Sequence, residues 1–468
     1  MDLEHTKELP KHLTKGGPGD KYLGNGKVDT SEWFSTDIMG TDIDSLDIQI
    51  KNQDIWFCSA PFQMIYADTR GNLAPCSWAK EGCGPNIKDV PFKQYFIHDN
   101  ALNQLRREML DPNSDHTTIN DTCRSCKYQE KTYGRSRRQA SLKIQSNNYK
   151  FWTRLRKSVY RFKESNCQLG HIEDRVFEVQ IKVFGNQCNL DCYMCMPFDS
   201  STRLVTMHND HLKKQNVFNI ASITPVASIK NTTMNSIIDQ IVDIAPYIYN
   251  MKLIGGEPLV MKQFYTLLER LIETGETKRM NVKYQTNMSV IEFDKVSITK
   301  FIPEFLHFEF TVSLDGIGKY NDYIRRKSNW EDIVNNCKSV LKYPNVKINV
   351  NGAISFLSVL RFYELIEWFD KNSDTFDQIN WSNIRSPSKL CANVLPDEIK
   401  ESLIDKYQNF PDIVNVLKED NHGLEYHDTL DYLLMMDKRY EGTKWEMNLF
   451  DIYPELEEFY IPKFKIEY

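Results

Sequence analysis

The sequence predicts an α/β protein built on a parallel sheet, and three observations lead to this fold class. From about residue 176 to residue 390, patterns typical of strands alternate with patterns typical of helices, which is the order of repeated βαβ units. Several predicted strands end in glycine or polar residues, at the edge where α/β barrels carry their chemistry. The first of these strands runs into a loop that holds Cys188, Cys192 and Cys195.

The strands are short apolar runs, and the helices show apolar residues at helical spacing. The predicted strands are residues 179–184, 251–254, 281–285, 308–314, 346–351 and 378–384. The predicted helices are residues 232–248, 264–274, 330–341 and 359–369. Strands that alternate with helices in this way favour one parallel sheet covered by helices.

The composition is that of a globular protein with a sizeable core. The chain has 468 residues and 54.9 kDa, with 41% hydrophobic and 26% charged residues, and its length suggests about three domains. The net charge of −6 does not favour general nucleic-acid binding. The start lacks the apolar core of a signal peptide, and no apolar run approaches the roughly eighteen residues of a membrane span. Eleven cysteines, several at short spacing, indicate metal ligands rather than disulfides, so we expect a cytoplasmic protein without membrane contact.

The cysteine loop has the chemistry of a metal site with one open position. Gly185 and Asn186 end the strand, and the three cysteines follow with the spacing C-x3-C-x2-C. Thiolates this close on one loop can converge on a metal centre. Three thiolates are one fewer than the four that close a structural zinc or iron–sulfur site. On this motif alone, a zinc site and a chance group of cysteines are the alternatives.

The loop sequence Cys188-Asn-Leu-Asp-Cys192-Tyr-Met-Cys195 resembles the cluster loop of the radical SAM superfamily. The resemblance implies that these cysteines hold a 4Fe-4S cluster, and that the amino and carboxylate groups of S-adenosylmethionine (SAM) occupy its fourth iron. It also implies an enzyme in which the reduced cluster cleaves the sulfonium to methionine and a 5′-deoxyadenosyl radical. Family members usually carry an aromatic residue just before the third cysteine, whereas this chain has Met194 there and Tyr193 one position earlier.

Later strand ends match the same family. Gly255-Gly256-Glu257-Pro258 resembles the segment that contacts the SAM amino group, and glycines let backbone carbonyls approach an ammonium whose charge a carboxylate complements. The resemblance implies that Arg325, with Arg326 as the alternate, pairs with the SAM carboxylate. Further SAM contacts are implied at Thr286, Asn287, Ser313, Asp315 and Asn351. The core, residues 176–395, is then expected to be a partial (β/α)6 barrel of the TIM type.

A second group of cysteines lies ahead of the core. Cys58 and Cys76 bracket a predicted hairpin, and Cys123 and Cys126 form a CxxC pair further on. Four thiolates suit a closed site, either a zinc hairpin or an iron–sulfur cluster. The spacing resembles the auxiliary-cluster module called SPASM, or its shortened twitch form, which implies one auxiliary 4Fe-4S cluster in residues 51–130. In relatives this module usually follows the core, whereas here it precedes it, and Cys83 is a spare thiol that could replace one ligand.

The remaining segments carry less information. Residues 1–50 are rich in glycine, aspartate and lysine and are expected to form an extended arm. Residues 131–175 form a basic, aromatic linker, in which residues 131–163 hold eleven Lys or Arg and no Asp or Glu. Such a stretch can bind nucleic acid or an acidic peptide, and we favour the alternative that it packs between the two cysteine-bearing units. Residues 396–468 are expected to be a helical, acidic extension.

The whole sequence thus predicts a radical SAM enzyme with one auxiliary cluster, which would relay an electron or staple its domain. A reductant such as flavodoxin or ferredoxin is an expected partner, nucleic acid is not, and no residue defines the substrate as a peptide, a protein or a small molecule. Three cysteines match no ligand position and are expected to be core or surface thiols: Cys167, Cys337 and Cys391. The competing hypotheses are a non-enzymatic zinc or iron–sulfur electron-transfer protein and an RNA- or peptide-binding protein that uses the basic stretch. Neither needs the strand-end residues of a SAM pocket.

Overall fold

The computed structural model describes residues 49–50, 55–134, 136–146, 149–164, 178–212, 231–421 and 426–460. Nearly all of the expected arm, and Cys167, lie outside these residues. None of the helices in the described part is both long and apolar enough to cross a membrane.

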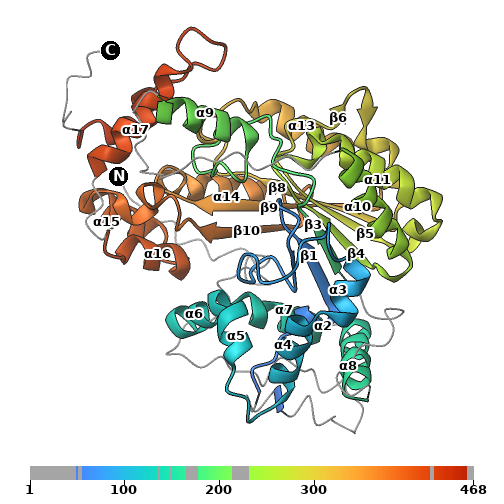
Figure 1. Ribbon diagram of the computed structural model, residues 1–468. Coiled ribbons are helices and arrows are strands. Elements are labelled where there is room, and N and C mark those ends of the chain that lie inside the picture. The colour runs from blue at the N-terminus through green and yellow to red at the C-terminus, as the bar shows by residue number, and fades with distance from the viewer. Residues whose placement is uncertain are drawn as a thin grey trace.

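A sheet of mostly parallel strands forms the centre of the structure (Figure 1). Within the described residues it has eight strands in the order β10-β9-β8-β5-β4-β3-β1-β2, and neighbours are parallel except for β1 and β2. The strands are β1 (Met64–Ala67), β2 (Leu73–Ala74), β3 (Glu178–Ile181), β4 (Asn250–Leu253), β5 (Asn281–Thr286), β8 (His307–Ser313), β9 (Val346–Ile354) and β10 (Gln378–Asn383). The predicted α/β class and its parallel sheet are therefore confirmed.

The two faces of this sheet differ because side chains alternate along each strand. One face carries fully buried apolar residues such as Val282, Phe310 and Val350. The apolar stripes of several helices complete the same core: α10 (Asn231–Asp243), α11 (Lys262–Glu273), α13 (Trp330–Val340) and α14 (Phe362–Lys371). The alternate residues make up what we call the polar face: Tyr66, Gln180, Lys252, Lys283, Gln285, Glu309, Thr311, Asn349 and Asn351.

The predicted helix at residues 232–248 is shorter in the structure. It ends at Asp243, and a 3₁₀ turn at Ala245–Tyr247 follows, because Pro246 lacks the N–H group that would continue the helix. The connection from β5 to β8, all of it described, contains the small hairpin of β6 (Glu292–Phe293) and β7 (Val296–Ser297) instead of an α-helix.

The N-terminal hairpin belongs to the same sheet as the core. β1 pairs in parallel with β3, with Tyr66 opposite Gln180, and β2 pairs antiparallel with β1. In the turn between them, Asp68 accepts hydrogen bonds of 2.8 Å from two backbone N–H groups. Gly71 has a φ of +86°, a conformation that favours glycine. The unit expected at residues 51–130 therefore shares its sheet with the core at residues 176–395.

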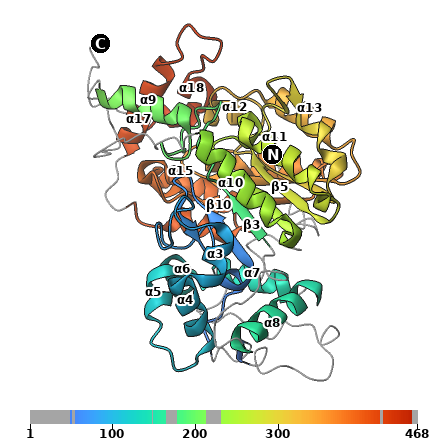
Figure 2. The same cartoon turned by 45° about the vertical axis from the view of Figure 1, so that its right-hand side comes forward.

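The chain between the hairpin and β3 forms a helical lobe on one side of the sheet (Figures 1 and 2). Its helices are α3 (Phe92–His98), α4 (Asn100–Leu110), α5 (Thr117–Thr122), α6 (Arg124–Tyr133), α7 (Arg137–Ser146) and α8 (Tyr149–Glu164). The last two form most of the basic stretch. α8 buries one apolar face, consisting of Trp152, Leu155, Val159 and Phe162, and packs on α7 and on α2 (Ala60–Gln63).

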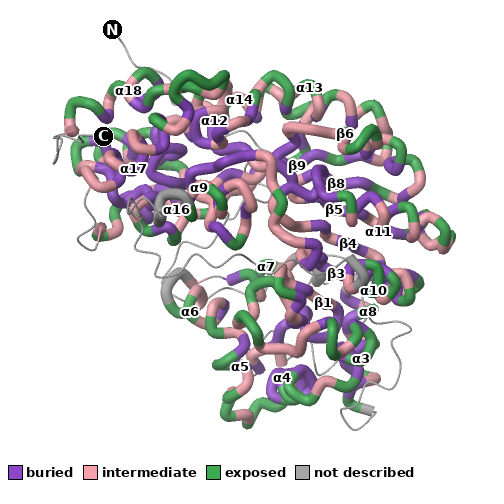
Figure 3. Tube along the Cα trace, turned by 45° about the horizontal axis from the view of Figure 1, so that its top comes forward, coloured by how far each residue is buried: buried purple, intermediate pink, exposed green. Residues whose placement is uncertain are grey.

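The C-terminal part adds helices α15 (Asp397–Lys406), α16 (Pro411–Lys418), α17 (Tyr426–Lys438) and α18 (Leu449–Ile452). α16 packs on β10, and α18 packs on α12 (Lys319–Ile324), which follows β8. α17 lies beside α9 (Ser201–Leu212) in both ribbon views. Figure 3 shows that buried residues continue from the sheet into the inward sides of these C-terminal helices.

Candidate functional site

The cluster loop, residues 185–196, leaves the carboxyl end of β3 and is held by its backbone on two sides. On one side, Thr202 at the start of α9 donates a hydrogen bond of 2.6 Å to the carbonyl of Cys188. On the other, the N–H of Tyr193 donates to the carbonyl of Ile324, at 3.1 Å, at the end of α12. The loop therefore presents its sulfur atoms from a fixed backbone.

The three cysteines of this loop lie together beside a guanidinium. A sulfur hydrogen bond between Cys192 and Cys195 raises the pKa of the first thiol and lowers the pKa of the second. Burial raises the pKa of Cys188 to about 12. Nη1 of Arg325 lies 4.0 Å from the sulfur of Cys192, and its charge interacts with all three thiols. A cation in this position favours thiolates and an anionic metal centre, so the donor set fits a cluster with three protein ligands.

In the described residues, no group of three or more His, Cys, Asp or Glu side chains surrounds a single ion position. Cysteines that hold a four-iron cluster bind a different iron each, so their sulfurs stand further apart than ligands that share one ion.

The glycines of the GGEP segment are required by the cluster loop. A Cβ atom on Gly256 would lie 2.3 Å from the carbonyl oxygens of Asn186 and Gln187. The next residue fixes the same contact, because the N–H of Glu257 donates a hydrogen bond of 2.7 Å to Gln187. The segment thus holds the cluster loop onto the end of β4, a contact that the sequence reasoning did not foresee.

Glu257 is a buried carboxylate that joins the ends of β4 and β5. Its Oε1 accepts hydrogen bonds from the N–H of Leu259, at 2.9 Å, and from the hydroxyl of Thr286, at 2.7 Å. Its Oε2 accepts from the N–H of Asn287, at 2.6 Å. Burial raises the pKa of Glu257 to about 7 although these donors act in the opposite direction. A carboxylate offers about four acceptor positions, so room is left for a donor such as an ammonium group.

Asp315 and Arg325 form a buried ion pair at the end of β8. Nη2 of Arg325 lies 2.8 Å from Oδ2 of Asp315, and Oδ1 of Asp315 accepts a hydrogen bond of 2.8 Å from the N–H of Ala353. Burial raises the pKa of Asp315 above its usual range, although the guanidinium lowers it. Nε of Arg325 has no hydrogen-bond partner among the described residues. Arg325 therefore links a strand end to the three cysteines and keeps one donor for a ligand.

Arg326, the alternate expected contact to the SAM carboxylate, has other partners than Arg325. Its guanidinium is buried, pairs with Asp437 of α17 at 2.5 Å and donates to the hydroxyl of Tyr193. It also donates to the carbonyl of Trp445, at 3.0 Å. These contacts use Nη1 and Nη2 of Arg326 for Tyr193 and the C-terminal part, while its Nε has no hydrogen-bond partner among the described residues.

The other expected SAM contacts lie at the same sheet edge. The amide of Asn287 donates a hydrogen bond of 3.1 Å to Asn189 of the cluster loop. Ser313 and Asn351 are register partners on β8 and β9, and neither side chain makes a hydrogen bond within the described residues. Pro258 is buried and begins the 3₁₀ turn Pro258–Val260.

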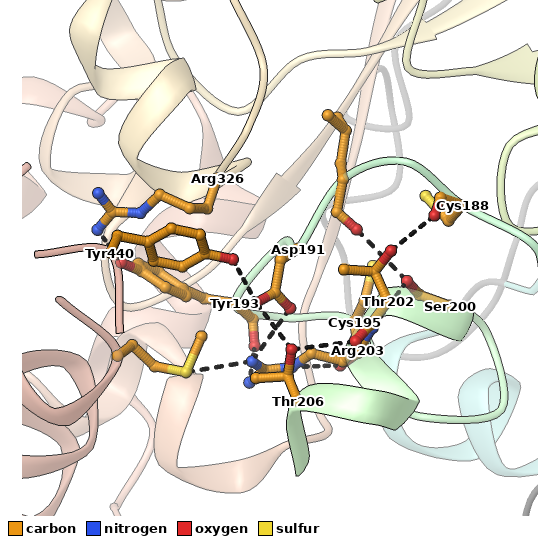
Figure 4. Close-up of polar contacts among 12 residues, drawn as sticks. Cys188, Asp191, Tyr193, Cys195, Ser200, Thr202, Arg203, Thr206, Arg326 and Tyr440 are labelled. Atoms are coloured by element: carbon orange, nitrogen blue, oxygen red, sulfur yellow. Dashed lines mark hydrogen bonds and ion pairs between the residues drawn. The ribbon is translucent and has the colours of Figure 1, made fainter. Parts of the chain in front are cut away.

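The C-terminal extension supplies residues to this site that the sequence reasoning missed. Figure 4 shows Asp191 of the cluster loop between Arg203 of α9 and Tyr440. The hydroxyl of Tyr440 donates a hydrogen bond of 2.7 Å to Asp191, and Nη1 of Arg203 lies 3.5 Å from the same carboxylate. Arg203 also donates to the carbonyl of Cys195, at 3.3 Å. The sequence held one signal for these contacts to the cluster loop. Asp437 is a polar residue that directly follows the mostly apolar helical run Leu430–Met436.

A second group of cysteines gathers in the N-terminal unit. Burial is the main cause, and the charge of neighbouring cysteines a further one, that raises the pKa values of these thiols. The pKa of Cys83 is raised to about 11, and the pKa of Cys123 is raised further. The thiols that interact in this way are Cys58, Cys76, Cys83, Cys123 and Cys126. Because Cys58 precedes β1 and Cys76 follows β2, this group lies at the amino end of β1, and the cluster loop lies at the carboxyl end of β3.

One arginine of the basic stretch is part of the packing around this second group. Arg138 makes a two-pronged ion pair with Glu130, at 2.8 Å for each bond, and also donates to the carbonyl of Phe57. Its guanidinium lies 4.5 Å from the ring centre of Trp56. These contacts agree with a structural role for this part of the basic stretch.

Comparison with known proteins gives one match to a family model, and it lies within the core. Residues 182–353 match the model of the Radical SAM superfamily. No curated protein sequence matches the chain. Among solved structures, the chain resembles anSMEcpe with bound AdoMet, at 16% identity and a TM-score of 0.33, over 50% of this chain and 61% of that one. It also resembles SuiB of Streptococcus suis bound to precursor peptide SuiA, at 17% identity and a TM-score of 0.34, over 56% of this chain and 52% of that one.

The chain thus spans less than two thirds of either solved structure, and likenesses of this size add nothing to the assignment. The family match stands on its own, and it covers the segment that begins at the end of β3 and includes the cluster loop, the GGEP segment and the Asp315–Arg325 pair. Residues 182–353 therefore match the model of the Radical SAM superfamily, and this match is the family evidence for the core.

Proposed function

We propose that this protein is a radical SAM enzyme that cleaves SAM at a 4Fe-4S cluster held by Cys188, Cys192 and Cys195. The observation that carries the proposal is the grouping of these cysteines beside Arg325, within the segment that matches the family. When bound, the cluster supplies the electron that cleaves the sulfonium of SAM and so gives the 5′-deoxyadenosyl radical. The protein binds and orients both partners and excludes water.

The residues at the carboxyl edge divide the binding of SAM between them. Glu257 offers a buried acceptor for the SAM ammonium, and its bonds to the end of β5 fix its position. Arg325 offers its unpaired Nε to the SAM carboxylate, while Asp315 keeps the guanidinium in place. Ser313 and Asn351 supply polar groups without partners in the described chain for the ribose or the carboxylate.

The second cysteine group supports the proposal of an auxiliary 4Fe-4S cluster, with Cys58, Cys76, Cys123 and Cys126 as ligands. Four thiolates saturate one cubane, so this cluster has an electron-relay or structural role rather than a substrate-binding one. Burial first, and then the charges of Asp68, Asp199, Glu81 and Cys76, raise the pKa of the Tyr66 hydroxyl on β1. Clusters of this kind call for a reducing compartment such as the cytoplasm, and for a reductant such as flavodoxin or ferredoxin.

Anaerobic reconstitution with iron and sulfide, followed by SAM and dithionite, tests the proposal. We expect 5′-deoxyadenosine from the parent protein and none from Cys188→Ser, which removes one ligand of the reactive cluster. Cys337→Ser is the matched control, because Cys337 is a buried core thiol away from both groups. A fully reconstituted protein that binds SAM and forms no 5′-deoxyadenosine would contradict the proposal.

A further inference from the structure

Asp191 and Arg203 form a fully buried ion pair at the cluster loop (Figure 4). Nη1 of Arg203 lies 3.5 Å from Oδ1 of Asp191, and both side chains are 0% exposed. Asp191 directly precedes Cys192 in the chain, so its charge lies close to the proposed cluster. A buried charge near a redox centre acts through a low dielectric and is screened little by salt.

The guanidinium of Arg203 reaches the other end of the loop from α9. Its Nε donates a hydrogen bond of 3.3 Å to the carbonyl of Cys195, and its Nη2 donates one of 3.2 Å to the carbonyl of Tyr193. The pair therefore puts a negative charge next to one proposed ligand, Cys192, and a positive charge against another, Cys195.

The two oxygens of the Asp191 carboxylate have different surroundings. Oδ2 accepts hydrogen bonds of 2.7 Å from the hydroxyl of Tyr440 and of 3.1 Å from the hydroxyl of Thr206. Oδ1 faces Arg203 and has no hydrogen-bond partner within the described part of the chain. Because desolvation offsets the attraction between buried charges, such a pair is weak evidence for a role in stability alone.

We propose that Asp191 and Arg203 set the reduction potential of the cluster held by the cluster loop, with opposite signs. The inference deepens the proposed function and rests on it, because it concerns the same cluster. Reduction transfers one electron from the reductant and so adds one negative charge to the cluster. The carboxylate opposes this added charge and the guanidinium favours it, so Asp191 lowers the potential and Arg203 raises it.

The test is the reduction potential of this cluster in the reconstituted full chain, measured anaerobically by titration with titanium(III) citrate and read by EPR. The relevant signal is the one that disappears when the three cysteines of the loop are replaced by Ala, so SAM is not needed to assign it. Asp191→Asn should raise the potential and Arg203→Met should lower it. Each shift should be about tenfold in the reduction equilibrium, which is about 59 mV for one electron.

The double variant, Asp191→Asn with Arg203→Met, removes both charges and should return the potential close to that of the parent. Opposite shifts in the single variants separate this role from a purely structural one. A loosened loop admits water, and it would move both potentials in the same direction or release iron from both variants. Shifts of the same sign, or no shift in variants with the iron content of the parent, overturn the inference.

Tyr440→Phe covers the case in which neither charge variant retains its iron, because it removes only one hydroxyl. The charge of Asp191 is then less compensated, so the potential should fall, by less than in Arg203→Met. Tyr426→Phe is the matched control, since its hydroxyl donates a hydrogen bond of 2.8 Å to the carbonyl of Leu456, away from the cluster loop. If the charge variants lose their iron, equal potentials for Tyr440→Phe and the parent overturn the inference.

The potential is read without SAM, so the two proposals fail separately. If the parent protein forms 5′-deoxyadenosine and the potentials do not shift as stated, only the role given to Asp191 and Arg203 is wrong. If the potentials shift and no 5′-deoxyadenosine forms, only the proposed function is wrong. A parent protein without the assigned EPR signal contradicts the proposed function, and the inference fails with it.

Discussion

Tyr193, which lies between two cysteines of the cluster loop, donates a hydrogen bond of 3.1 Å to Asp437, a residue 244 positions further along the chain. The same carboxylate pairs with Arg326 at 2.5 Å and accepts a hydrogen bond of 3.1 Å from the hydroxyl of Tyr323. Asp437 therefore fixes the cluster loop and the segment that carries Arg325 relative to each other. Burial raises the pKa of Asp437 to about 6 in spite of these donors.

Replacing Asp437 by Asn should destabilise the protein strongly. The change leaves the buried guanidinium of Arg326 without a counter-charge, and breaking such a pair costs about 3–5 kcal/mol. Urea unfolding of the parent and Asp437→Asn measures the loss. Glu441→Gln, at an exposed position shortly after α17, is the control and should unfold like the parent. Equal unfolding midpoints for all three proteins would contradict the role given to Asp437.

Replacing Arg325 should weaken SAM binding without changing the iron content, because the proposed function makes Arg325 a contact to SAM and not a metal ligand. Arg325→Met alone also leaves Asp315 buried without its cation, so stability should fall as well. The double variant Arg325→Met with Asp315→Asn removes both charges and should recover most of that stability, but not SAM binding. Calorimetry with SAM and an iron assay separate the effects. Parent-like SAM affinity in both variants would show that Arg325 is not a SAM contact.

The iron content should follow the two cysteine groups. If the chain holds two 4Fe-4S clusters, it should contain about eight iron atoms. Replacing Cys188, Cys192 and Cys195 by Ala should leave about four iron atoms per chain. Replacing Cys123 and Cys126 should also leave about four. Cys83→Ala should keep the parent value, because the other four thiols already saturate a cubane. Protein purified anaerobically that is rich in zinc and lacks iron–sulfur absorbance would disprove this arrangement.

Lys252 should make the stability of the protein depend on pH in the alkaline range. Its pKa is about 8 in the folded protein and 10.5 in the ordinary reference state, so between these values the unfolded chain binds more protons. The free energy of unfolding should therefore rise with pH across this window, and Lys252→Met should remove that part of the rise. Urea unfolding of both proteins near pH 7 and near pH 10 gives the comparison. The same increase in both would mean that Lys252 is not the titrating group.

The basic stretch should not bind RNA tightly. Arg138 is engaged with Glu130 and Phe57, and one face of α8 is buried in the lobe. Filter binding at several salt concentrations should show only weak retention. Tight binding that falls steeply with salt, as phosphate neutralisation requires, and that is lost in Arg137→Gln, would assign the stretch to nucleic acid instead.

The sequence predicted the sheet well because each core strand has a clear apolar pattern between glycine or polar residues. It also placed Glu257, Thr286 and Asp315 at the carboxyl ends of parallel strands, which share one edge of the sheet. It could not separate the roles of Arg325 and Arg326, since two adjacent arginines look alike until their partners are known. The role of Asp437 depends on packing between segments far apart in the chain, which local patterns do not contain.

The pairing of β1 with β3 also has a consequence for the integrity of the protein. β3 has only four residues, and its inner side pairs with β4. Without the N-terminal hairpin, β3 would become an edge strand, with free N–H and C=O groups next to the cluster loop that could pair with other chains. A truncated chain that begins just before β3 and keeps every residue that matches the family model would thus be prone to aggregation, so the N-terminal unit is part of the folded core.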